Sequence, residues 1–177
     1  FQQLDMLDNA IVRLKHSICD IEDLKKTGTI KTKSVLKDFD ELNCPHLVLP
    51  KDMTDIDDEF YMSLGITDDI ETIEVEKGNP IYHSEGNCLI ETATKTLVLG
   101  CKNSVIPDDG SVTKIGKCAF NGCQALKRIE IPESVTELGY MSLAYTGLEE
   151  LVVPEHLEEI AAHSFSLNRY LERIVVK

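Results

Sequence analysis

Long apolar runs are absent from this sequence. No stretch approaches the roughly 18 consecutive apolar residues of a membrane-spanning helix, so we expect no membrane insertion in this segment. Hydrophobic residues nevertheless make up 42% of the 177 residues, which is enough for a packed core and excludes general disorder. The length predicts one domain of ordinary size, or one domain and a small cap. Because the sequence begins at Phe1, we expect a trimmed piece whose signal region or anchor lies outside it.

Positive charge is scarce. Lys and Arg number 18 against 31 Asp and Glu, which gives a net charge of −13. Nucleic acids and anionic membrane surfaces reward clustered positive charge, so the sequence disfavours both as partners. The plain interpretation of the acidity is solubility, and the alternative is a site for cations or a basic partner.

Motifs that carry chemistry are also missing. The six cysteines form no CxxC pair and leave the redox compartment undecided, and the five histidines form no HxH or HExxH pattern. Cys44 and His46 are two possible metal ligands close together in the sequence, but a single pair is not a metal site. Cys123 has no matching histidine and acid nearby, as a nucleophilic cysteine would require. The segment from Asp108 to Gly110 is typical of a plain turn rather than a calcium-binding loop. We therefore expect no catalytic residue, no metal and no cofactor.

The C-terminal part of the sequence repeats itself. Residues 112–132, 135–154 and 157–177 align at six apolar positions, and their starts are separated by 23 and then 22 residues. Leucine-rich repeats have a period of about 20–29 residues. A drifted copy lies upstream, where residues 47–56 resemble residues 129–138.

Each repeat contains a short in-out-in triplet that predicts a strand, and a proline closes most of these triplets. Because each unit leaves an apolar face open, neighbouring units must stack, and the strands should form a parallel sheet on one face of a solenoid. Phe120, Leu143 and Phe165 occupy one equivalent position and should fill the space between coils. We expect these parallel strands near residues 47–49, 73–75, 104–106, 129–131, 151–153 and 174–176.

The pattern resembles the leucine-rich repeats of the BspA-like family of bacterial surface proteins. The resemblance is carried by Ile106-Pro107, Ile115-Gly116, Ala119-Phe120, Cys123 and the residues up to Pro132. Residues 79–100 also resemble a segment interspersed in this family, which we interpret as a β-hairpin insert (about 86–100) with strands at 88–90 and 96–99. The resemblance implies a cell-surface or secreted protein whose repeats mediate adhesion or protein contacts, and no catalytic residues.

The first 42 residues predict a different structure. Apolar residues from Leu4 to Ile21 recur at spacings of 3 and 4, which predicts a helix over about 2–26, and a shorter helix is expected over 34–42. This segment is either a cap over the open end of the first repeat or a dimerising coiled coil. The three heptads are short for an independent coiled coil, which favours the cap. The fold prediction is thus an α/β repeat solenoid, with a helical cap at 1–42 and leucine-rich repeats at 43–177.

The outward positions of the predicted strands form the candidate protein-binding strip. Arg128, Glu150 and Arg173 should stack on successive strands as plus, minus and plus. Such a ladder either stabilises the sheet or takes part in recognition, and the two roles are compatible. The full strip comprises Val48, Glu74, Val105, Arg128, Glu130, Glu150, Val152, Arg173 and Val175.

Two functions follow from these observations. The first is a non-catalytic, adhesive interaction module of an extracellular protein, and the second is an intracellular scaffold or regulatory domain whose N-terminal helix docks a partner. The last repeat matches the internal pattern and shows no polar cap, so we expect Leu171, Ile174 and Val176 to be partly exposed. We therefore expect this end to continue into more structure or to pair with another molecule, and the N-terminal helix is the other candidate for self-association.

Overall fold

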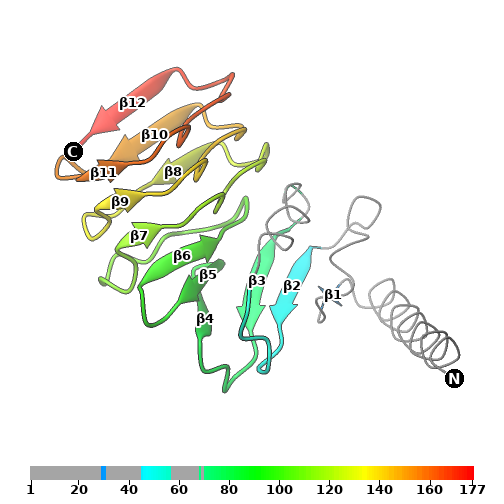
Figure 1. Cartoon of the computed structure of the whole chain (residues 1–177). Helices are drawn as coiled ribbons and strands as arrows, with labels where there is room; N and C mark the ends of the chain where they lie inside the picture. The colour runs from blue at the N-terminus through cyan, green and yellow to red at the C-terminus, as the bar shows by residue number, and fades with distance from the viewer. Residues whose placement is uncertain (1–28, 31–44, 57–67, 69) are drawn as a thin grey trace, which may run out of the picture.

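The computed structural model describes residues 29–30, 45–56, 68 and 70–177 (Figure 1). All regular elements in these residues are β-strands arranged in three sheets. The helices expected at 2–26 and 34–42, and with them the α part of the expected fold class, lie outside the described residues. The described part is a solenoid of stacked coils with parallel strands.

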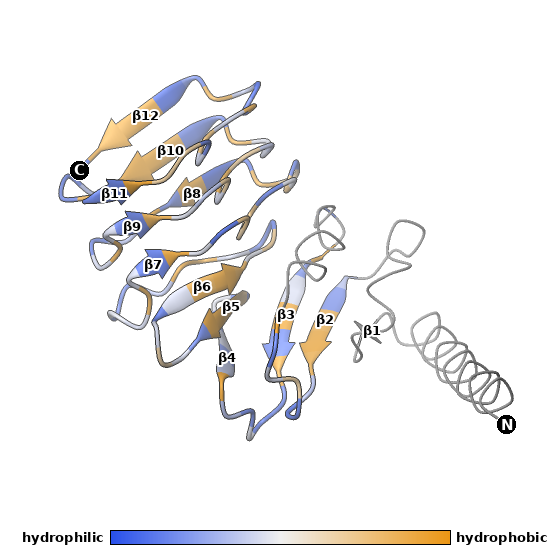
Figure 2. Ribbon diagram, viewed as in Figure 1, coloured by the Kyte–Doolittle hydropathy of each residue, from blue (hydrophilic) through white to orange (hydrophobic). Residues whose placement is uncertain are grey.

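One sheet follows the repeat pattern. Strands β8 (Arg128–Glu130), β10 (Glu150–Val153) and β12 (Arg173–Val176) are parallel, in the order β12-β10-β8. Ile129, Leu151 and Ile174 are directly paired, as the alignment of the three repeats predicts. Strands β10 and β12 begin with hydrophilic residues and end with hydrophobic ones (Figure 2). The predicted strands near 129–131, 151–153 and 174–176 are therefore confirmed within one residue at each end.

A second parallel ladder corrects the expectation that strands lie on one face only. It consists of β7 (Lys114–Ile115), β9 (Glu137–Leu138) and β11 (Glu159–Ile160). Lys114 pairs with Glu137, and Glu137 pairs with Glu159, so successive coils stack in register here too. Two residues are too few to show an alternating pattern, which is why the sequence did not reveal these strands. Each complete coil thus contributes one strand to each of two sheets.

The hairpin insert extends this second ladder. Strands β4 (Tyr82–Glu85), β5 (Cys88–Glu91) and β6 (Thr96–Leu99) are antiparallel neighbours, and β6 then pairs in parallel with β7. The predicted hairpin is confirmed, although β4 was not expected as a third strand. The insert is therefore built into the solenoid as an end of its six-stranded sheet.

The predicted strand at 104–106 does not form. Val105 instead donates its N–H to the carbonyl of Gly86 at 2.8 Å, which ties this segment to the turn between β4 and β5. Gly86 has a φ of +57°, and a Cβ there would lie 2.0 Å from the Val105 carbonyl oxygen. The close approach to the insert thus holds residues 104–106 away from β8.

The upstream copy forms a sheet of its own. Strands β1 (Thr29–Ile30), β2 (His46–Leu49) and β3 (Thr72–Val75) pair in parallel, and no ladder joins them to β8. The strands predicted near 47–49 and 73–75 are confirmed. The expectation of one continuous strand face from 47 to 176 is wrong, because the insert and the displaced 104–106 segment interrupt the ladder.

The core lies between the two ladders. Phe120 and Leu143 are fully buried, whereas Phe165 is only partly buried because it belongs to the last described coil. Phe120 packs so closely under Gly100 that a Cβ added there would lie 2.0 Å from its ring. At the C-terminal end, Ile174 and Val176 are 52% and 64% exposed and Leu171 is partly buried, which confirms the expected exposure of that end.

Candidate protein-binding surface

The charge ladder occupies the start of three neighbouring strands. Arg128, Glu150 and Arg173 are directly paired across β8, β10 and β12. Arg128 Nη1 lies 2.5 Å from Glu150 Oε1, and Arg173 Nη2 binds the other carboxylate oxygen, Oε2. The Glu150 side chain is only 14% exposed, whereas both arginines are largely exposed. The predicted alternation of charge is therefore present, with one carboxylate held between two guanidinium groups.

Val152 is the strip residue that does not reach the surface. It faces outward in register with Glu130 and Val175, yet it is 2% exposed. Lys177 binds Glu130 Oε1, and this ion pair runs from the end of β12 to β8 and so crosses β10. The ion pair thus joins the two strands on either side of Val152, and the hydrogen bond from Lys177 is the largest cause of the lowered pKa of the Glu130 carboxyl. Val152 therefore lies at an outward position, as expected, but it is buried and does not contribute accessible surface to the strip.

The other strip residues lie in separate places. Val48 and Glu74 pair with each other in the β2–β3 sheet, which no ladder joins to β8. Val105 is 71% exposed but lies on the irregular 104–106 segment, and Val175 is half-buried on β12. The accessible strip on the repeats is therefore formed by β8, β10 and β12, with Val105 across a gap from β8.

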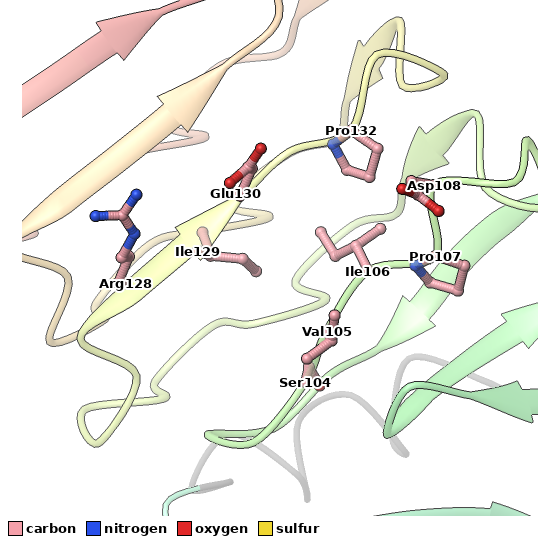
Figure 3. A pocket seen from close by; sticks show the side chains of 9 residues that line it. All are labelled: Ser104, Val105, Ile106, Pro107, Asp108, Arg128, Ile129, Glu130 and Pro132. Atoms are coloured by element: carbon pink, nitrogen blue, oxygen red, sulfur yellow. The ribbon is translucent and has the colours of Figure 1, made fainter.

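A groove of about 540 Å³ occupies that gap (Figure 3). One wall is the 104–108 segment and the other is β8 with the residues up to Pro132. Arg128 lies at one end of the groove and Asp108 at the other, with Val105, Ile106 and Ile129 between them (Figure 3). The groove was not predicted from the sequence, because residues 104–106 were expected to form a strand of the same parallel sheet as β8.

The described candidates for metal or acid–base chemistry, His46 and Asp109, make ordinary structural hydrogen bonds. Among the described residues, no group of three His, Cys, Asp or Glu side chains could hold a metal ion. His46 contacts the Thr72 hydroxyl at 2.8 Å, and Cys44 lies outside the described residues. Asp109 accepts the N–H of Ser111 at 2.9 Å, which closes a turn, and hydrogen bonds from Ser111 lower its pKa.

Two buried thiols lie beneath the 104–106 segment. Burial raises the pKa of Cys88 to about 12 and also raises the pKa of Cys101. The Cys101 thiol contacts Ser104 Oγ, and the Ser104 hydroxyl donates to the carbonyl of Asn87 at 2.6 Å. A nucleophilic cysteine requires a depressed pKa, so these thiols pack as small apolar groups.

In the part of the chain that the structure describes, no helix has the length and apolar character needed to cross a membrane.

Comparison with protein families gives a match over the stacked coils. Residues 95–177 match the family described as BspA type leucine rich repeat region, in six copies. These residues are therefore similar to the repeats of that family. The match begins within the hairpin insert, just before β6, and includes both walls of the groove and all of β8, β10 and β12. No curated protein is similar enough in sequence to count as a match.

Three solved structures resemble the chain. A leucine-rich repeat protein from Eubacterium ventriosum is 20% identical, with a TM-score of 0.40, over 75% of this chain and 50% of that one. The pneumococcal vaccine antigen PcpA is 16% identical, with a TM-score of 0.54, over 84% of this chain and 42% of that one. A leucine rich cell surface protein from Faecalibacterium prausnitzii is 15% identical, with a TM-score of 0.36, over 85% and 51%. The likeness to PcpA shows a shared fold, and the match covers about half or less of each relative's length.

Proposed function

We propose that the chain is a non-catalytic protein-interaction module of a bacterial cell-surface or secreted leucine-rich-repeat protein, with adhesion as its role. The observation that carries this proposal is the exposed face of β8, β10 and β12, where Arg128 and Arg173 present guanidinium groups held by Glu150. A face of mixed charged and apolar groups on a rigid sheet suits recognition of another protein.

Two further observations support the proposal. Arginine is enriched in protein interfaces, and an arginine that is already oriented by a carboxylate loses little side-chain entropy when it binds. The BspA-type match covers this face, and PcpA, which shares the fold, is named as a vaccine antigen. A location at the cell surface is consistent with the BspA-type match and with the likeness to a vaccine antigen.

A photo-crosslinking experiment tests the proposal. A photoreactive amino acid is placed at Arg173, on the proposed face, and, as a matched control, at Glu159 on the opposite ladder; both residues are exposed and lie on parallel strands. The full-length protein is then irradiated on intact cells together with the surfaces to which those cells adhere. We expect a crosslinked protein from position 173 alone, and we expect antibodies against this chain to label intact cells.

Two results would contradict the proposed function. Equal crosslinking from positions 159 and 173 would show that the β8–β10–β12 face is not the binding surface. Labelling that requires permeabilised cells would exclude the surface location. Charge reversal by Arg173→Glu should abolish capture of the identified partner, while Glu159→Arg should leave it unchanged.

A further inference from the structure

The edge of β8 that faces the groove has no strand partner among the described residues. In the β12-β10-β8 sheet, β8 pairs with β10 alone. Alternate residues of a parallel strand direct their N–H and C=O groups to opposite edges. Ile131 donates its N–H to the Val152 carbonyl at 2.9 Å, so residues 129 and 131 face β10. The main-chain groups of Arg128 and Glu130 therefore point into the groove.

The groove cannot be filled by the segment that the repeat pattern assigns to it. Residues 104–106 occupy the repeat position next to β8, but Val105 donates its N–H to Gly86, and its carbonyl contacts the Cys88 thiol at 3.8 Å. The insert thus satisfies the main chain of Val105, while the main chain of β8 stays open. An edge of this kind is a template for another strand.

The chemistry of the groove defines what fits. Its sides are apolar, with Val105, Ile106 and Ile129, and Pro107 and Pro132 lie toward one end. Arg128 is paired with Glu150, and Glu130 is paired with Lys177. Asp108, at the proline end, is exposed and forms no ion pair with any described residue. The groove therefore combines open main-chain groups, apolar sides and one carboxylate that has no ion-pair partner among the described residues.

We propose that this groove binds an extended segment of a partner protein by strand addition to β8, with a lysine or arginine of that segment against Asp108. The inference deepens the proposed protein-binding function and rests on it. The three residues of β8 span about 10 Å, which matches three or four residues of an added strand. Main-chain hydrogen bonds to Arg128 and Glu130 supply the affinity, and the apolar sides and Asp108 supply the selectivity.

Selection from a phage-displayed library of random twelve-residue linear peptides tests the proposal on the whole chain. We expect the enriched peptides to alternate apolar and polar residues, to lack proline in that stretch, and to contain a lysine or arginine at one end. In Glu130→Pro, the N–H that points into the groove is lost while the ladder bonds to β10 are kept, since proline is tolerated on an edge strand. Glu130→Ala is the matched control, because it removes the same carboxylate and keeps the N–H.

The expected result is that Glu130→Pro binds the selected peptides at least about fivefold more weakly than Glu130→Ala, the effect of one lost hydrogen bond. Asp108→Asn should weaken the binding of the same peptides, and so should replacement of the basic residue of those peptides by glutamate. If Glu130→Pro does not fold, the peptides are N-methylated at alternate positions, and one of the two alternations should abolish binding to the wild-type chain.

Three outcomes would overturn the proposal. The first is a library that yields no binder, and the second is equal affinity for Glu130→Pro and Glu130→Ala, or for both N-methylated peptide sets when Glu130→Pro does not fold. The third is concentration-dependent self-association of the wild-type chain that Glu130→Pro abolishes, because the occupant would then be a second copy. None of these three outcomes changes the crosslinking expected from position 173. Failure of the strand-addition proposal is therefore distinguishable from failure of the proposed protein-binding function.

Discussion

Truncation of Phe120 to alanine is the sharpest test of how the solenoid is held together. The ring is fully buried between the two ladders, and it lies against Gly100, which has no side chain that could move into the vacated space. Leu143 stacks on the next coil at the equivalent position and is also fully buried. The cavity left by Phe120→Ala should therefore stay largely empty.

Removal of a buried aromatic side chain costs about 3–5 kcal/mol through lost transfer energy and the residual cavity. In a domain of this size, such a loss lowers the melting temperature by roughly 6–20 °C. Phe165 occupies the same position in the last described coil, but it is only partly buried. Phe165→Ala should consequently cost less than about 3 kcal/mol.

Urea unfolding followed by far-UV circular dichroism measures both variants, since the chain has no tryptophan to serve as a fluorescence probe. The comparison is made at equal m-values, so that a change in midpoint reports stability. The reasoning would be refuted if Phe120→Ala left the midpoint unchanged. It would also fail if Phe165→Ala were as destabilising as Phe120→Ala, because a neighbouring coil would then not be what buries this position.

Three further predictions follow from the packing and the charges. Gly100→Ala places a Cβ 2.0 Å from the Phe120 ring, so we expect strong destabilisation that Phe120→Leu partly relieves; additive effects in a double-mutant cycle would exclude this contact. Glu150→Gln removes the carboxylate between two arginines and should lower the free energy of unfolding by about 1–2 kcal/mol. The control Glu149→Gln, at an exposed neighbouring residue, should change the free energy of unfolding by less than about 0.5 kcal/mol. Burial raises the pKa of Cys88 from 9.0 to about 12, so its contribution is present below pH 9 and is lost as the pH rises from 9 toward 12, where only the unfolded chain releases the proton. Unfolding titrations at pH 8 and pH 10 should therefore show a steeper loss of stability in the wild type than in Cys88→Ala, and identical slopes would contradict the burial of this thiol.

Local regularity explains what was predictable. The repeats at 112–132, 135–154 and 157–177 specify the same apolar positions three times, and stacking is the arrangement that buries all of them at once. The register of β8, β10 and β12, the burial of Phe120 and the charge ladder around Glu150 therefore followed from alignment alone. The hairpin at 86–100 was predicted from its resemblance to a family segment.

The candidate site was predicted less completely. Alternation along a strand says which side chains face outward, but it does not say which of them remain accessible. Val152 lies at an outward position and is nevertheless buried, and the ion pair from Lys177 to Glu130 crosses its strand. That contact joins residues 47 positions apart in the sequence, and no local pattern encodes it.

By itself, the sequence determined the period of the coils, their inward residues and the position of one strand in each, since these depend on short-range alternation and on the need to bury an apolar face. Tertiary structure alone decided that a second ladder forms, that the strand face is interrupted and that a groove opens beside β8. The reason is a competition for one main-chain segment. The hydrogen bond from Val105 to Gly86 ties residues 104–106 to the insert, and one edge of β8 is left without a partner among the strands that the structure describes. Such a choice between two distant partners depends on how the insert packs, which only the folded chain specifies.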